Sequence, residues 1–574
     1  MSTRAGAMAT FVWLLVRPWT SDGFSIAQSH LLLPQASWSQ SQLYLASASS
    51  SNHVDAYTHT DAVIVGGGPA GLLSAIMLAQ KYPDKSIEVF DRLKPPPSPS
   101  DEAIWSDVAR FYLIGLGFRG QQALKTFGVW DAVQQHTNQA VGRMDWAPDA
   151  VKYEDGVEKI FTDRPAVTEV IPRDKLVGVL HDFITDQYPG RIQLNYQCEV
   201  EALEFGGSAG NDHGTPSTPS TSLPAVIQVT KCEEESQAHD PSACQDQPTR
   251  LCDVEGARTM TTDLLVAAEG SARTIASQIE AHDKKKMEAM GFIDRLSFKP
   301  FSITRYEDDN QRVYKSIPIK LPAGWRPDLN YSARSKDGRV IFDALPADAN
   351  GNYCGVLLLK KEDELAAANT EVVKLRDLIV EYLPQFSPLI DDENMAGIAK
   401  KPPSFLPSFR FAGPRLHQGD KCVVLGDAAH TIKPYFGLGA NSALQDVEVF
   451  SQCLDSTSSI KDAVEKFSEE RAGEAEAMVQ ISRQLDRPGT LGLLAFIIPL
   501  LLDSAFHSLA PTFFEQNTLA MFQRLDYDFR SIQRRKRLDR FNQVLVLGVF
   551  AYGLSKTKYI FDALAQITGH SSST

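Results

Sequence analysis

The chain of 574 residues is long enough for two or three domains, and 43% hydrophobic and 22% charged residues are ordinary proportions for a globular protein. The net charge of -14 and the pI near 5.4 argue against a nucleic-acid partner, because phosphate binding needs a positively charged surface. Seven cysteines do not make a disulfide scaffold, and the spacing of Cys232, Cys244 and Cys252 matches no zinc motif, so we expect no metal site.

Residues 1–59 are expected to be a leader rather than part of the fold. Asp22 and Asp55 are the only acidic residues in this segment, and serine and alanine are abundant. This composition is typical of an organelle transit peptide for a plastid or a mitochondrion. The apolar run from Met8 to Val16 leaves a secretory signal open, and a disordered tail is a third alternative.

A strand, a glycine-rich turn and a helix are predicted next, over Asp61–Val65, Gly66–Gly71 and Leu72–Lys81. The spacing Gly66-x-Gly68-x-x-Gly71 is the dinucleotide fingerprint: the glycines permit a tight turn, close approach of a pyrophosphate and close packing of helix on strand. A second strand, Ser86–Phe90, ends at Asp91, where a carboxylate can accept hydrogen bonds from a ribose. The pattern predicts a nucleotide site without separating FAD from NAD.

The middle of the chain alternates strands with polar loops. Residues 206–224 and 232–258 are expected to be disordered, and alternating apolar residues over about 300–360 predict an antiparallel sheet. From Leu425 onward the pattern is mostly helical. The other predicted elements are a helix at Arg173–Asp186 and strands at Gln193–Val200, Ala225–Thr230 and Leu264–Ala268.

A second cofactor motif follows at Cys422–His430, where an apolar strand delivers Gly426-Asp427 into a loop that contains Pro434, Gly437, Gly439 and Asn441. The glycines and the helix start after Gly439 predict a pocket lined by backbone N–H groups, which suits the anionic edge of a flavin ring. Asp427 can hold a ribityl hydroxyl. The two motifs together predict FAD.

The segments GGGPAG…VFDR and GDAAHTIKPYFGLGANSALQDVEVF resemble the single-component aromatic flavoprotein monooxygenases, and RFYLIGLGFRG at Arg110–Gly120 is similar as well. The resemblance extends over about residues 60–560. It implies an α/β fold with a Rossmann-type FAD-binding domain over 60–480, a substrate-binding β-sheet inserted at about 285–400, and a helical C-terminal extension over 481–574.

The family's chemistry implies that NAD(P)H reduces FAD, that O2 adds to the reduced flavin at C4a as a hydroperoxide, and that one oxygen atom is transferred to a small aromatic substrate. No amino-acid nucleophile is needed, and we assign no catalytic side chain. The resemblance implies substrate contacts at Arg143, Phe161 and Arg110. The implied cofactor contacts are Gly66, Gly68, Ala70, Gly71, Phe90, Asp91, Arg92, Gly115, Arg119, Arg173, Cys198, Glu269, Gly270, Gly426, Asp427, Pro434, Gly437, Gly439, Ala440 and Asn441.

The sequence departs from the family at two places. The middle FAD motif carries Glu269 instead of Asp, Arg273 instead of Ser and Ala276 instead of Arg. In the family member that it resembles most, an Arg, two Tyr and an Asn hold the substrate carboxylate. Arg143 matches the Arg, whereas Phe161, Leu485 and Asn517 replace the other three. The lost hydrogen-bonding groups predict a changed specificity.

Two alternatives remain at this stage. One is an epoxidase or quinone hydroxylase of the same fold that acts on a lipid-like substrate. The other is a non-catalytic flavoprotein tethered to a membrane, which the altered middle motif keeps open. A halogenase is not favoured because the chain has no Trp-x-Trp-x-Ile-Pro segment.

The C-terminal extension combines basic and apolar residues. Its apolar runs Leu491–Leu502 and Val544–Leu554 are shorter than the roughly 20 residues that span a bilayer. A basic stretch, Arg530–Arg540, leads directly into the second run, which predicts a helix on a membrane surface with its cations at the lipid headgroups. A solvated charged face is the alternative, and the oligomeric state is left open.

Overall fold

The structure is a computed structural model, which describes residues 57–105, 107–108, 111–148, 150–162, 164–208, 222–231, 257–307, 311–486, 489–522, 524 and 526–569. All of these residues belong to one unit of the chain, Gln35–Thr574. Nearly all of the predicted leader lies outside the described residues, and so do 209–221 and 232–256 of the two loops expected to be disordered.

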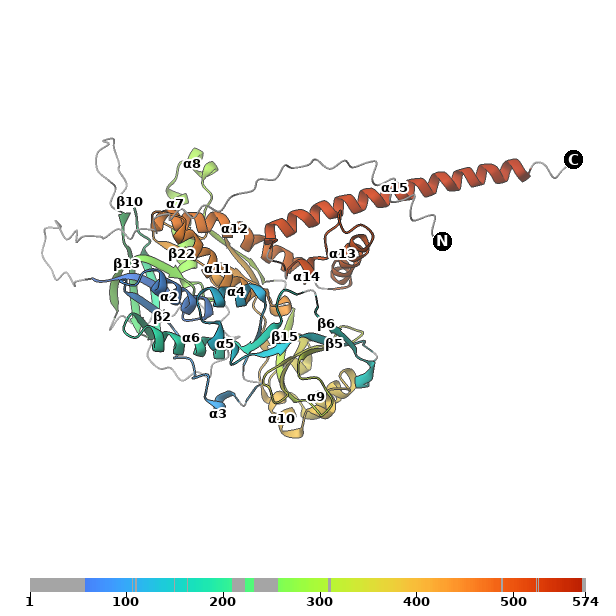
Figure 1. Ribbon diagram of the computed structural model, residues 1–574, viewed down its shortest axis with the longest axis horizontal. Coiled ribbons are helices and arrows are strands. Elements are labelled where there is room, and N and C mark those ends of the chain that lie inside the picture. Colours follow the sequence, from blue (N-terminus) through green and yellow to red (C-terminus); the bar gives the residue numbers. More distant parts are fainter. Residues whose placement is uncertain are drawn as a thin grey trace. The chain divides into compact units, whose positions relative to one another are not determined.

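A mainly parallel sheet carries the first cofactor motif (Figure 1). Its strand order is β21-β22-β13-β1-β2-β8, with β12 and β9 added in antiparallel pairing beside β13. The central strand β1 is buried on both faces over its second half, which is typical of a parallel strand covered by helices. The strands are β1 Thr58–Val65, β2 Ile87–Asp91, β8 Ile192–Tyr196, β9 Cys198–Glu204, β12 Ala225–Lys231, β13 Arg258–Ala267, β21 His417–Gln418 and β22 Cys422–Val424.

The single strand predicted at Gln193–Val200 is wrong. The chain forms β8 and β9 instead, and the two pair with different partners, β2 and β12. Gln197 between them has a φ of 56°, a left-handed conformation that ends the ladder, and its N–H donates to the carbonyl of Leu93 at 2.9 Å. No glycine or proline marks this break in the sequence.

A second sheet, with strand order β19-β15-β18-β17-β16-β5-β6, packs its apolar face with helices α9 Val372–Tyr382 and α10 Asp392–Lys400 around Phe342 and Phe386. Two of its strands, β5 and β6, come from residues far before the predicted insertion at 285–400. The strands are β5 Gly142–Trp146, β6 Val157–Ile160, β15 Arg312–Lys320, β16 Leu329–Arg334, β17 Ile341–Pro346, β18 Asn352–Lys360 and β19 Ser404–Phe405.

Three small sheets complete the strands: β3-β7-β4, β14-β20-β23 and the hairpin β10-β11. The hairpin occupies both ends of the first loop that the sequence predicted to be disordered. The strands are β3 Leu113–Leu116, β4 Asn138–Ala140, β7 Thr168–Pro172, β10 Gly207–Ser208, β11 Ser222–Leu223, β14 Ser302–Tyr306, β20 Phe409–Gly413 and β23 His430–Thr431.

Helices surround the first sheet and form the C-terminal extension, where α13 and α14 both contact α15 (Figure 1). Within the described residues, no helix is both long and apolar enough to cross a membrane. The sheets and helices confirm the predicted α/β fold class. The remaining helices are α2 Pro69–Lys81, α3 Glu102–Trp105, α4 Phe118–Thr126, α5 Trp130–Gln134, α6 Arg173–Gln187, α7 Thr274–Ala289, α8 Phe292–Ser297, α11 Leu438–Asp455, α12 Ile460–Leu485, α13 Gly489–Leu509, α14 Thr518–Met521 and α15 Phe529–Gly569.

Candidate functional site

The glycine loop between β1 and α2 is too tight for any side chain. Gly66 has a φ of 109°, and a Cβ on Gly71 would lie 1.8 Å from the carbonyl oxygen of Gly66. Asp91 at the end of β2 accepts a hydrogen bond from the N–H of Gly67 at 2.6 Å, which fixes its carboxylate beside the loop. Sequence reasoning therefore located both parts of a nucleotide site that the fold brings together.

The N-terminus of α2 is open for an anion. Gly68 caps the helix without a side-chain hydrogen bond, and Pro69 follows at the first helical position. Because the first N–H groups of a helix have no partner within it, this end attracts a phosphate. A Cβ on Gly68 would meet only the Nη2 atom of Arg173, at 3.6 Å. A helix terminus and a guanidinium thus flank a space that suits a pyrophosphate.

The second motif forms a loop that starts beside the first. Gly426 has a φ of 65°, and a Cβ there would lie 3.3 Å from the Cβ of Ala70, the second residue of α2. Asp427 follows and is partly buried, and desolvation raises the pKa of its carboxyl group. The charge of Arg173 acts on Asp427, so the two motifs share one electrostatic environment.

A buried carboxylate that the sequence reasoning missed fixes this loop. Asp446 on α11 is fully buried and accepts hydrogen bonds from the Gly426 N–H at 2.9 Å and from His430 Nε2 at 2.7 Å. Its other oxygen accepts from Arg471 Nε at 2.8 Å. Burial alone would raise the pKa of Asp446, but Arg471 and His430 hold it at about 2. Asp446 lies within the quoted segment GDAAHTIKPYFGLGANSALQDVEVF, and its place on the apolar face of a helix could have marked it.

Asn441 ties the flavin-type loop to the segment before α4. Its Oδ1 accepts from the Gly117 N–H at 2.8 Å and the Gly120 N–H at 3.2 Å. Its Nδ2 donates to the carbonyl oxygens of Gly115, at 2.8 Å, and Gly437, at 2.5 Å. The structure therefore brings the predicted residues Gly115, Gly437 and Asn441 together through one buried side-chain amide.

Arg119, one of the implied cofactor contacts, links α4 to the C-terminal extension. Its Nη2 donates to the carbonyl oxygens of Arg524 at 2.6 Å and Tyr527 at 2.7 Å, and its guanidinium lies over the ring of Phe529. These contacts join α4 to the C-terminal extension. A buried arginine in this segment thus serves the junction between the two parts of the chain.

The altered middle motif adjoins both loops. Glu269 Oε1 accepts from the Ile275 N–H at 2.7 Å at the start of α7, and burial raises its pKa to about 7. Arg273, with a φ of 54°, donates to the carbonyl oxygens of Ala428 at 3.0 Å and Asp427 at 2.5 Å. Its Nη1 is buried without a partner among the described residues. The motif therefore fixes the Gly426–Thr431 loop through the hydrogen bonds that Arg273 donates to it.

Three tyrosines from different parts of the chain lie near the flavin-type loop or in it: Tyr112 just before β3, Tyr314 on β15 and Tyr435 in the loop itself. Tyr112 and Tyr435 are each 37% exposed, yet desolvation raises the pKa of both phenols. Tyr314 of β15 and Asp427 act electrostatically on Tyr112, and Asp343 of β17 acts on Tyr435. Residues of the second sheet therefore lie within electrostatic range of the flavin-type loop. Sequence reasoning assigned no role to Tyr112, Tyr314 or Asp343, although Tyr112 lies in the segment RFYLIGLGFRG.

The predicted substrate residues are only partly brought together. Arg143 pairs with Asp145 on its own strand at 2.6 and 2.5 Å, and Phe161 lies against Arg164. Arg110 lies outside the described residues. Elsewhere, Leu485 ends α12 and packs in an apolar cluster, whereas Asn517 caps α14 by accepting from Ala520.

The other predicted cofactor residues lie in or next to these loops and strands. Phe90 is buried in β2, exposed Arg92 follows that strand, and Cys198 begins β9. Gly270 has a φ of 63° beside Glu269. Pro434 begins a short helical turn that ends before Gly437, and Gly439 and Ala440 form the first turn of α11.

These groups fit FAD. The glycine loop, the α2 terminus and Arg173 suit its pyrophosphate, Asp91 suits the adenosine ribose, and the loop from Gly426 to Asn441 suits the ribityl chain and ring. The unpartnered Nη1 of Arg273 gives the same region an unused hydrogen-bond donor.

Comparisons with known proteins agree with this fit. The FAD binding domain family matches residues 409–482. Kynurenine 3-monooxygenase of Salinispora tropica is 23% identical over 429 residues, which cover 73% of this chain and 78% of that protein. The Sus scrofa enzyme of the same name is 26% identical and covers 82% of this chain and 85% of its own.

Among solved structures, a variant of 2-methyl-3-hydroxypyridine-5-carboxylic acid oxygenase is 16% identical and superposes with a TM-score of 0.51, covering 83% of this chain and 98% of its own. At that identity the likeness establishes the shared fold alone. The sequence similarities and the cofactor loops identify the chain as an FAD-dependent monooxygenase that resembles kynurenine 3-monooxygenase.

Proposed function

We propose that the protein hydroxylates a small aromatic substrate related to kynurenine and consumes NAD(P)H and O2. The observation that carries the proposal is that Asn441 bonds the Gly115 carbonyl, three residues after Tyr112, to the carbonyl of Gly437, two residues after Tyr435. Tyr314 of the second sheet and Tyr435 both lie within electrostatic range of Tyr112. Bound FAD supplies the redox and oxygen chemistry. The names of the Salinispora tropica and Sus scrofa relatives support the substrate class.

The protein's own part is to orient the substrate and exclude water. Tyrosine rings give flat apolar walls against which an aromatic ring packs, while their hydroxyl groups restrict its orientation. Tyr435 also lies within the electrostatic influence of Asp486 and Arg312. Asp486 in turn pairs with the buried Lys433 at 2.6 Å, which anchors the segment that carries Tyr435.

The test measures substrate-stimulated NAD(P)H oxidation by the purified FAD-loaded protein with kynurenine, anthranilate and apolar aromatics. The masses of the products are determined by mass spectrometry. A product heavier by one oxygen atom from an aromatic substrate supports the proposal. Epoxide or hydroxylated quinone from a lipid-like substrate would favour the same-fold alternative. An absence of stimulation across the panel would favour a non-catalytic flavoprotein.

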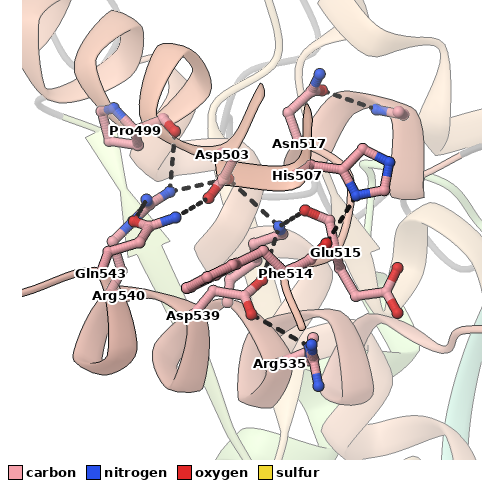
Figure 2. A network of polar contacts seen from close by, with 12 residues as sticks. Pro499, Asp503, His507, Phe514, Glu515, Asn517, Arg535, Asp539, Arg540 and Gln543 are labelled. Carbon is pink, nitrogen blue, oxygen red and sulfur yellow. Dashed lines mark hydrogen bonds and ion pairs between the residues drawn. The ribbon is translucent and has the colours of Figure 1, made fainter. Parts of the chain in front are cut away.

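We also propose that the C-terminal extension lies on a membrane surface. Asp503 of α13 and Asp539 of α15 are fully buried, and Arg540 reaches Asp503 at 2.9 Å (Figure 2). The outward faces carry Leu501, 66% exposed, and Phe541, 67% exposed. A helix pair with charges inside and apolar residues outside suits an apolar environment, and the basic start of α15 suits anionic headgroups.

Import into a plastid or mitochondrion by residues 1–59 is a further proposal, supported by the composition of that segment. Fusion of these residues to a fluorescent protein tests it in cells. A fusion that stays in the cytosol would refute import, whereas secretion would favour the signal-peptide alternative.

A further inference from the structure

Arg164 is a partly buried cation that follows strand β6 of the second sheet. It lies between β6 and β7, and its guanidinium carbon is 3.6 Å from the centre of the Phe161 ring. Its Nη1 donates to Thr168 Oγ1 at 3.0 Å. Within the described part of the chain, no carboxylate lies within ion-pairing distance of Arg164. One edge of a fixed guanidinium is therefore left for another acceptor.

Arg143, the arginine that the resemblance implied as a substrate contact, differs from Arg164 because it forms an ion pair with a carboxylate. Asp145 accepts two hydrogen bonds from it and compensates its charge. Arg143 and Arg164 are close enough to interact: burial first, and then the charge of Arg143, lowers the pKa of Arg164 to about 10. Among the described residues, these two cations share one carboxylate, that of Asp145.

The Arg164 side chain is linked to the flavin-type loop through Thr168 and Gly115. Thr168, the partner of Arg164, has its Cγ2 atom 3.0 Å from where a Cβ on Gly115 would stand. The carbonyl oxygen of Gly115 accepts from Asn441 and lies 3.7 Å from where a Cβ on Gly437 would stand. Arg164 is therefore two contacts away from the loop, on the side that faces the second sheet.

We propose that Arg164, rather than Arg143, binds the carboxylate of an anionic aromatic substrate. A guanidinium held over an aromatic ring at 3.6 Å can direct its remaining N–H groups to a carboxylate. Phe161, which stands where the family has a tyrosine, then has a physical role. Its ring packs against the Arg164 guanidinium, whereas the tyrosine would donate a hydrogen bond through its hydroxyl group. This inference rests on the proposed aromatic monooxygenase function and assigns its specificity.

The test compares two ligands that differ in a carboxylate: kynurenine and its decarboxylated analogue kynuramine. Binding to the oxidised FAD-loaded protein is followed by the change in flavin fluorescence, without NAD(P)H, so turnover is not needed. The variants are Arg164→Gln and Arg164→Lys, with Arg143→Gln as the matched control. FAD content and melting temperature of each variant verify folding.

Loss of a charge-assisted bidentate pair should weaken kynurenine binding by Arg164→Gln about 10- to 100-fold and leave kynuramine binding unchanged. Arg164→Lys should be intermediate, and Arg143→Gln should change binding by less than about threefold. Equal weakening of both ligands, or a larger effect of Arg143→Gln, overturns the assignment. So does a wild-type protein that binds neither kynurenine nor benzoate nor anthranilate. Oxygenation of an uncharged aromatic would then still support the proposed function.

Discussion

Replacing Asp446 with asparagine should destabilise the protein, because the site needs an acceptor on both sides of the side chain. One carboxylate oxygen faces Arg471, and the other faces the Gly426 N–H and His430 Nε2. Asparagine offers one oxygen and one amide group, so a donor would face a donor in either orientation. Arg471, 5% exposed, would also lose the charge that compensates its own.

The magnitude follows from this burial. Removing one partner of a buried ion pair costs about 3–5 kcal/mol, because the remaining charge stays in the protein interior. The charged hydrogen bonds lost by Gly426 and His430 lie within that figure. The control is Asp455→Asn on the same helix, where the side chain paired with Lys81 is 55% exposed. That change should cost less than about 1 kcal/mol.

Urea unfolding of the apoprotein, followed by circular dichroism, measures both free energies at neutral pH. FAD titration monitored by fluorescence measures the second expected effect, a weaker affinity of Asp446→Asn, since Gly426 begins the loop that Asp446 holds. A loss of stability no larger than that of Asp455→Asn would refute the reasoning.

Three other predictions address the middle motif and the extension. Arg273→Gln should weaken FAD binding about tenfold or more in fluorescence titration, because it removes charged hydrogen bonds to the Gly426–Thr431 loop, whereas Arg305→Gln, on a partly exposed side chain, should not. The raised pKa of Glu269 means that the folded apoprotein keeps a proton that the unfolded chain loses between pH 4.5 and 7. The free energy of unfolding should therefore fall by up to about 3 kcal/mol over this range, and Glu269→Gln should show a smaller fall, as urea unfolding at several pH values would reveal. Leu501→Glu combined with Phe541→Glu should abolish flotation with vesicles of anionic lipid, and Val373→Glu, at an exposed apolar site on α9, should not; flotation that persists would contradict the surface helix.

The sequence was sufficient for the cofactor loops because their geometry is local. Gly66 and Gly71 are required by a turn between adjacent elements, and Asp91 ends the neighbouring strand. These constraints act over about thirty residues and leave fixed spacings. Asp446 and Arg273 act on the same loop, but they come from helices or turns whose distance along the chain has no rule.

The substrate side could not be predicted in the same way. Arg143 matches a family position, but its charge depends on Asp145 two residues away on the same face of a strand. Arg164 gains its place from a contact with Thr168 and from the packing of that strand against Gly115. Such pairings arise from tertiary packing, which residue identity alone does not encode.

The altered middle motif bears on whether the protein retains its chemistry. Read as a list of residues, Glu269, Arg273 and Ala276 look like the loss of an aspartate, a serine and an arginine. In the fold, the longer Glu269 side chain still accepts a hydrogen bond from the Ile275 N–H at the start of α7. Arg273, three residues before the family's arginine position at Ala276, donates to the carbonyl oxygen of Asp427. The carboxylate and the guanidinium are therefore both present at the cofactor loop, which removes the reason for treating this chain as a flavoprotein without activity.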